Sequence, residues 1–432
     1  MMSPDFAPHL RALAEVIVRV GVNLQPGQPL LITEPYELQG IHPEAAPQGE
    51  AIRAAVSELE PGRPRPGIEV ITSDPARLRA LAEADDLRGY EALVSAHTRR
   101  LQQHLARGGA FLFLLGSQPQ LMSGLPAERL SRFDRLKWRH FGPIIQRLIR
   151  GASQWTLAPA PSAAWAEAAY GDLPAAERLP ALWRTVFQAM RIDGSNVGGA
   201  LRPDSALSAH KVPPTPDPVE QWHTHFAALA HRRDELNAAR HRHIRYVGPG
   251  TDLTLDLPRS HAWCTAQLTS RAGVPFVANL PTEEIFTAPH KNSAHGTVRV
   301  ARPVTHGGTV IDGIKLEFRR GRVICATAAS GQDALQHLLA TDNGAGRIGE
   351  VALVENVGGS LPPDSVLSGH QAPSTWPTSG RLFHHTLLDE NAANHIALGD
   401  AYRFCSRAWV PLALNSSQVH LDLPVDAQVS LS

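Results

Sequence analysis

The chain has 432 residues, too many for one ordinary hydrophobic core, and we expect two domains. Hydrophobic residues make up 43% of the sequence and charged residues 19%, which is a globular composition and not a disordered one. The 41 basic and 41 acidic residues cancel, so the charge predicts no nucleic acid and no anionic membrane as partner and favours a small or neutral one.

The three cysteines, Cys264, Cys325 and Cys405, are widely spaced and odd in number, which indicates neither a disulfide framework nor a cysteine-based zinc site. The first residues lack the basic stretch and apolar run of a signal peptide, and no apolar run approaches the roughly 20 residues of a membrane span. The sequence therefore predicts a soluble protein in a reducing compartment, the cytoplasm.

The first half of the chain alternates helical and strand patterns. Leu10, Leu13, Ile17 and Val18 recur at helical spacing, and the segment that follows reads as a strand after a Pro-Gly turn. The expected strands span 27–33, 67–74 and 108–117, and the next expected helices span 50–58 and 76–84. Continuous apolar strands in such alternation predict an α/β fold, a mostly parallel sheet covered by helices. No glycine-rich phosphate loop follows these strands, so a nucleotide cofactor is not supported.

A loop-like, proline-rich stretch from about 205 to 216 marks the expected boundary between an N-terminal α/β domain, 1–210, and a second domain, 211–432. A helix is expected at 219–241, with its histidines on the polar face. Beyond it, short alternating segments are separated by glycine-rich turns. This pattern predicts a β-rich α+β domain with mostly antiparallel strands.

Two consecutive carboxylates, Glu283 and Glu284, lie between Pro281 and Pro289. Solvated surface is the ordinary explanation of such a pair. The two prolines instead predict a strand end running into a fixed loop, and functional residues concentrate in loops that a rigid scaffold holds. Because successive side chains of an extended chain point to opposite faces, only one of the two carboxylates can point directly into a given site.

Further metal-binding residue types follow in the same half of the chain. Glu350 precedes an apolar run, and the segment 389–402 carries Asp389, Glu390, His395 and Tyr402. His420 and Asp422 alternate with aliphatic residues, so on a strand they share one face. Each has an ordinary structural explanation, such as a satisfied core histidine or a carboxylate at a helix start.

Together these groups form a set of nitrogen and oxygen ligands without thiolates, which suits Zn²⁺, Co²⁺ or Mn²⁺. Carboxylates can bridge, and two ions ~3.5–4 Å apart are a recurrent arrangement for activating water in aminopeptidases. In such a site, one glutamate of the Glu283–Glu284 pair would bind a metal ion and the other would act as general base.

Four segments then resemble the signatures of the M29 metallo-aminopeptidases: NLPTEEIFTAPHKNSAHGTV (279–298), TDNGAGRIGEVALV (341–354), LDENAANHIALGDAY (388–402) and NSSQVHLDL (415–423). The likeness extends in order over nearly the whole chain. It implies a cytoplasmic homodimer that removes N-terminal residues from peptides with a free N-terminus. It also implies two divalent ions, Zn, Co, Mn or Mg, in a C-terminal catalytic domain.

The resemblance implies six metal ligands: Glu284, Glu350, His395, Tyr402, His420 and Asp422. By position, Glu283 resembles the catalytic base, and Tyr402 is also assigned to catalysis. Two departures from the family pattern are a Pro/Ser/Gly-rich insertion around 368–382, expected to form a loop near the site, and an end of the chain soon after Asp422. We expect an aminopeptidase that uses metal-activated water. The alternatives are a member that binds metal or peptide without turnover, and another two-metal amide hydrolase.

Overall fold

The computed structural model describes residues 5–59, 67–116, 118, 120–192, 217–306, 309–354 and 381–432. The predicted domain boundary near residue 210 and most of the predicted insertion at 368–382 lie outside these ranges, and the division into two domains stays a prediction. Among the described helices, none is both long and apolar enough to cross a membrane.

The N-terminal half is a parallel sheet between layers of helices. Its strands run in the order β2-β1-β3-β4, and each neighbouring pair is parallel. The elements are α1 (Phe6–Val16), a π-helical turn (Ile17–Gly21), β1 (Leu30–Thr33), a short 3₁₀ turn (Pro43–Ala45), α2 (Ala46–Leu59), β2 (Ile68–Val70), α3 (Pro75–Glu83), α4 (Leu87–Ala106), β3 (Ala110–Leu115), α5 (Ala127–Ile149), β4 (Trp155–Pro159), α6 (Ala163–Tyr170) and α7 (Ala175–Ala189). This architecture confirms the predicted parallel sheet.

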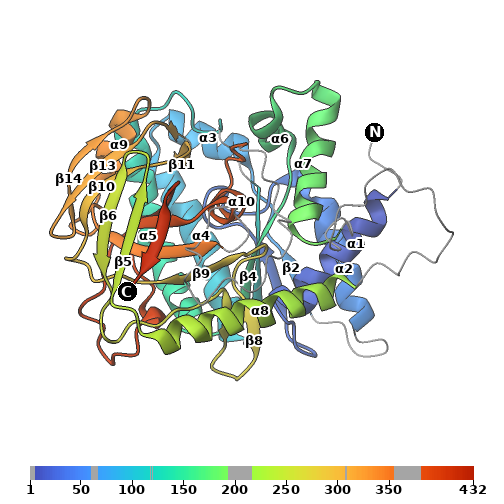
Figure 1. Cartoon of the computed structure of the whole chain (residues 1–432). Helices are drawn as coiled ribbons and strands as arrows, with labels where there is room; N and C mark the ends of the chain where they lie inside the picture. Colours follow the sequence, from blue (N-terminus) through green and yellow to red (C-terminus); the bar gives the residue numbers. More distant parts are fainter. Residues whose placement is uncertain are drawn as a thin grey trace, which may run out of the picture.

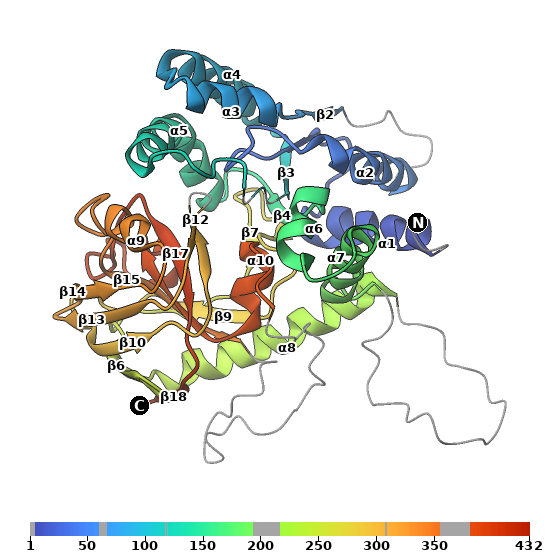
Figure 2. The same cartoon turned by 90° about the horizontal axis from the view of Figure 1, so that it is seen from above.

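Apolar side chains on both faces of β1 and β3 explain why helices cover this sheet on two sides. Leu31 and Phe111 pack with Ile144 of α5, whereas Ile32 and Leu112 belong to the larger core that includes α1. Figure 2 shows α4 and α5 on one side of the strands and α1 and α7 on the other. Burial on both faces is the reason that these strands read as continuous apolar runs in the sequence.

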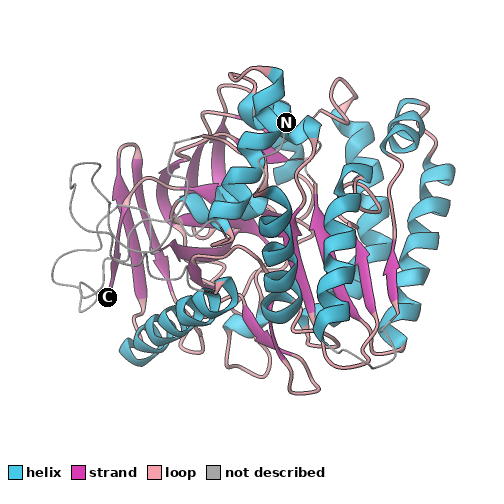
Figure 3. Ribbon diagram, turned by 90° about the vertical axis from the view of Figure 1, so that its right-hand side faces the viewer, coloured by secondary structure: helices cyan, strands magenta, loops and turns pink. Residues whose placement is uncertain are grey.

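The C-terminal half is β-rich and antiparallel, as predicted. Its elements are α8 (Pro218–Ala239), β5 (His243–Gly248), β6 (Thr251–Asp256), β7 (Gln267–Thr269), β8 (Pro275–Val277), β9 (Glu284–Thr287), β10 (His295–Arg299), β11 (Val304–His306), β12 (Thr309–Ile311), β13 (Lys315–Arg319), β14 (Arg322–Thr327), α9 (Gln332–Leu339), β15 (Ile348–Val354), α10 (Thr386–Asp389), η3 (Glu390–Ala392), β16 (His395–Gly399), η4 (Arg403–Cys405), β17 (His420–Pro424) and β18 (Gln428–Leu431). Figure 3 shows how these strands lie beside the helix-covered sheet.

Two antiparallel sheets build most of this half. One has six strands in the order β14-β13-β10-β6-β5-β18, and the other has four in the order β17-β16-β15-β9. Burial alternates residue by residue along β5 and β6, while every residue of β15 and β16 is buried. The four-stranded sheet therefore lies inside the molecule, and the six-stranded sheet has one face in water.

Helix α8 joins the two halves along one side of the molecule (Figure 1). Asp217 caps its first turn by accepting a hydrogen bond from the Val219 amide (3.0 Å), and the helix ends where Arg240 adopts a left-handed conformation (φ 52°). His223 and His231 are exposed as predicted. The prediction is wrong for His225, whose Nε2 lies 2.9 Å from the Thr282 carbonyl oxygen because this face of α8 packs toward β9.

The segment before η3 is held against the end of the parallel sheet. The Trp165 indole of α6 donates a hydrogen bond to the Phe383 carbonyl (2.5 Å), and its ring stacks on His385 at 4.3 Å between centroids. His385 Nε2 in turn lies 3.1 Å from the carbonyl oxygen of Leu115, the last residue of β3. The N-terminal half thus fixes the chain that leads into η3 and β16.

Gly399 lies at the end of β16, and we expect any larger residue at this position to destabilise the fold. Its φ is 104°, and a Cβ there would lie 2.0 Å from the Val419 carbonyl oxygen. Gly399→Ala is expected to destabilise the protein by more than the roughly 1–3 kcal/mol of a strained backbone alone, because the clash forces β16 and β17 apart. Chemical unfolding measures this loss of stability.

Gly273→Ala is the control for that experiment. Gly273 also has a positive φ, 81°, but a Cβ there meets no atom within 4 Å. This variant should show only the backbone strain. Equal stabilities for the two variants would mean that β16 and β17 tolerate the added methyl group.

Candidate metal centre

The four-stranded sheet gathers five of the predicted ligands on one of its faces. Glu284 begins β9, Glu350 lies in β15, and His395 begins β16, while β17 carries His420 and Asp422. These strands are neighbours in the order β17-β16-β15-β9. Residues that are far apart in the sequence therefore lie side by side, because long-range strand pairing brings their strands together.

The strand register explains why the side chains converge. Glu350 and Asp422 both lie opposite Ala397, one on each side of β16, and residues in such a cross-strand row point to the same face. His395 is two residues before Ala397 and shares that face. The small side chain of Ala397 leaves space between the two carboxylates.

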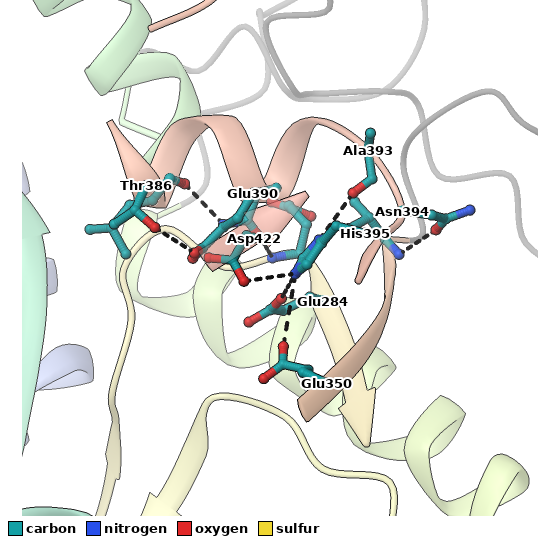
Figure 4. A network of polar contacts seen from close by, with 12 residues as sticks. Glu284, Glu350, Thr386, Glu390, Ala393, Asn394, His395 and Asp422 are labelled. Carbon is teal, nitrogen blue, oxygen red and sulfur yellow. Dashed lines mark hydrogen bonds and ion pairs between the residues drawn. The ribbon is translucent and has the colours of Figure 1, made fainter. Parts of the chain in front are cut away.

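The distances within the cluster are those of ligands around an ion. His395 Nε2 lies 3.3 Å from Glu284 Oε2 and 3.8 Å from Glu350 Oε1 (Figure 4). His420 Nε2 lies 3.8 Å from Glu350 Oε2 and 3.4 Å from Asp422 Oδ1. His395 Nε2 also lies 4.0 Å from Asp422 Oδ1, so this nitrogen faces three carboxylates and that of His420 faces two.

The described residues form two groups whose ligand atoms all lie within 4.8 Å of one another. The first group is Glu284, Glu350 and His395, and the second is Glu350, His420 and Asp422. Glu350 belongs to both and directs one oxygen to each histidine. A carboxylate in that position can bridge two ions.

Backbone contacts orient both histidines for metal binding. His395 Nδ1 lies 3.2 Å from the Ala393 carbonyl oxygen, and His420 Nδ1 lies 3.1 Å from the Asp400 carbonyl oxygen. A ring nitrogen that donates to a carbonyl fixes the tautomer and leaves Nε2 with its lone pair, as in most metal-binding histidines.

Without a cation, the cluster compensates its negative charge by holding protons. Burial alone would lower the pKa of His395, but hydrogen bonds with Glu284 and Glu350 raise it well above its usual value. Burial would also lower the pKa of His420, but the charge of Asp422, its hydrogen bond with His420 and the charge of Glu350 together raise it to about 10. Burial, together with the neighbouring carboxylates, also raises the pKa of Glu350. Positive charge, from a proton or from a metal ion, therefore stabilises this cluster.

The donor atoms fit divalent ions by a second criterion. Glu284 Oε2 and Glu350 Oε2 are buried, and among the described residues they face only the imidazole nitrogens of His395 (3.3 Å) and His420 (3.8 Å), without a well-aligned hydrogen bond. Buried polar atoms of this kind are costly unless a partner such as an ion satisfies them. The imidazole and carboxylate set, which has no thiolate, suits Zn²⁺, Co²⁺ or Mn²⁺.

The cluster has a closed end and an open end. The side chains of Glu284, Glu350 and His395 are at most 5% exposed, whereas those of Asp422 and His420 are 17% and 28% exposed. The side of His420 is therefore the end of the cluster that is nearer to solvent.

Tyr402, the sixth predicted ligand, lies at this open end. Its ring centroid is 5.3 Å from that of His420, and it stacks on Phe404 at 5.2 Å. Burial and the negative charge of Glu350 raise the pKa of its phenol well above the usual value. The assignment of Tyr402 as ligand and catalytic residue stays a prediction.

The side chains of Glu283 and Glu284 point in different directions at the start of β9. The pair lies where a loop runs into a strand, and not at the end of one. Glu284 points to His395, while the Glu283 carboxylate contacts Arg191 and His225. The predicted base at Glu283 stays a prediction, and its contacts are with helices α7 and α8 instead of the cluster.

Glu390, a candidate from the sequence that is not among the six implied ligands, lies beside the cluster. Figure 4 shows its carboxyl group next to that of Asp422. Burial, followed by the charges of Glu284 and Asp422, raises its pKa well above the usual value. Glu390 and Asp389 both precede His395 in the signature segment, and no spacing pattern in the sequence shows which of the two lies nearer the cluster.

Comparison with known proteins agrees with this geometry. The family described as "Thermophilic metalloprotease (M29)" matches residues 6–200 and 204–430. The chain belongs to the M29 family.

Individual relatives in this family are similar over nearly their full lengths. Aminopeptidase T of Thermus thermophilus is 32% identical over 98% of this chain and 93% of its own. Aminopeptidase 2 of Geobacillus stearothermophilus is 32% identical over 95% of this chain and 90% of its own. The solved structure of wild-type AmpT from Thermus thermophilus superposes with a TM-score of 0.80 at 29% identity, covering 99% of this M29 chain and 98% of that one. The resemblance inferred from the signature segments is thus confirmed.

Proposed function

We propose that this M29 metalloaminopeptidase removes N-terminal residues from peptides with a free N-terminus, at a centre of two divalent ions. The observation that carries the proposal is the pair of ligand groups that share Glu350. Family membership supports the reaction class, and the names of the aminopeptidase relatives support the peptide substrate.

The proposed ligands divide between the two ions. Glu284 and His395 would hold one ion, His420 and Asp422 the other, and Glu350 both. We place Tyr402 beside the ion at the open end and add Glu390 as a further oxygen donor next to Asp422. The identity of the ions, Zn, Co, Mn or Mg, is left to metal analysis.

Ions in these positions would polarise the scissile carbonyl and lower the pKa of a water molecule, which is the chemistry that two-metal hydrolases require. The protein supplies the geometry. The carbonyl oxygens of Ala393 and Asp400 hold the two imidazoles in place, and the rigid sheet holds the carboxylates. Burial at the Glu284 end keeps bulk water away from that side, so the polar substrate groups meet the cluster only at its open end.

Blocking the substrate amine is expected to abolish cleavage, because an exopeptidase must recognise a free N-terminus. The test compares Leu-p-nitroanilide with N-acetyl-Leu-p-nitroanilide, measuring kcat/KM after addition of Zn²⁺ or Co²⁺. We expect turnover of the free amine only.

Other outcomes separate the alternatives. Equal cleavage of blocked and free substrates would indicate another two-metal amide hydrolase. Binding of metal or peptide with no turnover of Leu-, Arg- or Ala-p-nitroanilide would indicate a member that has lost catalysis. The homodimer is a separate proposal, which the mass measured by light scattering in solution tests.

A further inference from the structure

The carboxylate beside the proposed ligand Glu284 is the centre of a second buried ionic contact. Glu283 Oε1 lies 2.6 Å from Arg191 Nη2, and Glu283 Oε2 lies 3.5 Å from His225 Nε2. The Glu283 side chain is 0% exposed and that of Arg191 is 7% exposed, so both charges are out of water. An arginine and a carboxylate at this distance form a charge-assisted hydrogen bond, the strong kind.

Arg191 is itself held from two directions. It follows the C-terminus of α7 in a left-handed conformation (φ 58°), and its guanidinium lies 4.3 Å from the centre of the Trp222 ring. The Trp222 indole donates a hydrogen bond of 2.9 Å to the Met190 carbonyl. Helices α7 and α8 are thus joined beside the point from which the Arg191 guanidinium extends to Glu283.

The backbone at Thr282 and Glu283 is clamped as well. The Thr282 carbonyl accepts a hydrogen bond from His225 Nε2 (2.9 Å), so this nitrogen carries a proton. Burial lowers the pKa of His225 despite the nearby Glu283 charge, so that Arg191 is the charged partner. From the side of the cluster, the Asn391 side chain accepts a hydrogen bond of 2.6 Å from the Glu283 amide.

These contacts reach the residue immediately before Glu284. In an extended chain, Glu283 and Glu284 point to opposite faces, so fixing the Glu283 side chain on α7 and α8 also fixes the direction of Glu284. Groups that orient a metal ligand commonly change metal affinity about 10–100-fold when removed.

We propose that Glu283, Arg191 and His225 are positioning residues that aim Glu284 at the metal centre, with Glu283 acting through its ion pair and not through proton transfer. The inference rests on the proposed function in so far as Glu284 is a metal ligand. It assigns a role to two residues, Arg191 and His225, that lie 92 and 58 positions before Glu283 and outside every signature segment.

The test is a Zn²⁺ titration of full-length protein stripped of metal by chelation, comparing wild type with Glu283→Gln and Arg191→Met. Both variants are expected to bind Zn²⁺ about 10–100-fold more weakly. If these are positioning residues, the kcat of each variant is low at limiting Zn²⁺ and rises toward the wild-type value at saturating Zn²⁺. For a general base, Zn²⁺ affinity stays at the wild-type value while kcat falls by roughly 10²–10⁴ at any Zn²⁺ concentration, and this result would overturn the proposal.

A double variant distinguishes loss of positioning from misfolding. Each single substitution leaves one buried charge without its partner, whereas Arg191→Met combined with Glu283→Gln removes both charges and is expected to restore thermal stability. Because the two residues act as one unit, the double variant should lose no more Zn²⁺ affinity than either single variant. Additive losses would mean that the two residues act independently and would contradict the inference.

Asp172→Asn is the matched control. Asp172 pairs with Arg381 at 2.6 Å, and that guanidinium lies 4.4 Å from the Tyr170 ring, so carboxylate, guanidinium and aromatic ring meet as at Glu283, but in a more exposed place away from β9. Its Zn²⁺ affinity should equal that of the wild type. A wild-type protein that binds no Zn²⁺ would refute the proposed function itself, whereas wild-type affinity in Glu283→Gln and Arg191→Met would refute only the positioning role.

Discussion

Glu350→Gln is expected to lower kcat/KM roughly 10³-fold or more and to weaken the binding of both ions. Glu350 belongs to both ligand groups, and a neutral amide is a poorer ligand than a carboxylate. Loss of metal-derived charge stabilisation amounts to several kcal/mol, which corresponds to that change in rate. Steady-state kinetics together with metal analysis of the purified variant measures both effects.

Two comparisons make the Glu350 experiment specific. Asp422 belongs only to the second group, so Asp422→Asn should weaken the binding of one ion and leave the binding of the other unchanged. Glu69→Gln on β2 removes a half-exposed carboxylate that pairs with Arg100 at 2.5 Å, and it should leave metal content and rate unchanged. Retention of two ions by Glu350→Gln would show that the carboxylate is not shared.

Removal of metal is expected to abolish activity, and Zn²⁺ or Co²⁺ is expected to restore it. The same treatment should lower thermal stability, because an ion at a concentration of 100 times its Kd stabilises the folded state by about 2.7 kcal/mol. Without ions, the carboxylates of the cluster repel one another, and its histidines must hold protons. Activity assays and thermal unfolding of the apo and reconstituted protein give the two results.

Metal content must be measured in the chelated sample. Full activity with negligible metal would rule out a metalloaminopeptidase. Activity that one equivalent of Zn²⁺ per chain restores completely would show that a single ion is sufficient, against the proposed centre of two ions. Restored stability without restored activity would favour a member that binds metal without turnover.

Local sequence patterns determined much of the fold. The apolar runs at 27–33 and 108–117 became β1 and β3 because strands buried on both faces have no polar positions. The alternation around His420 and Asp422 placed both on one face of β17, since the side-chain period of a strand is two residues. The signature segments likewise identified five residues that the sheet brings together.

The same local patterns could not show which partners meet. Whether Glu283 or Glu284 faces the cluster depends on the register of β9 against β15, in which Glu284 lies opposite Val354. The sharing of Glu350 between two groups depends on Ala397 lying between it and Asp422. Register is set by contacts between strands that are distant in the sequence, so the spacing of residues along one strand does not predict it.

The sequence by itself thus determined the kinds of elements, the family and most of the residues that we propose as ligands, because periodicity and signature residues are local properties. Only the tertiary structure decided that Glu390 lies beside Asp422 and that Arg191 and His225 pair with Glu283. The physical reason is that the contacts of Glu283, just before β9, with Arg191, just after α7, and His225 on α8 exist only after three distant segments have packed. Before that packing, an arginine after one helix and a histidine on another look like any solvated side chains.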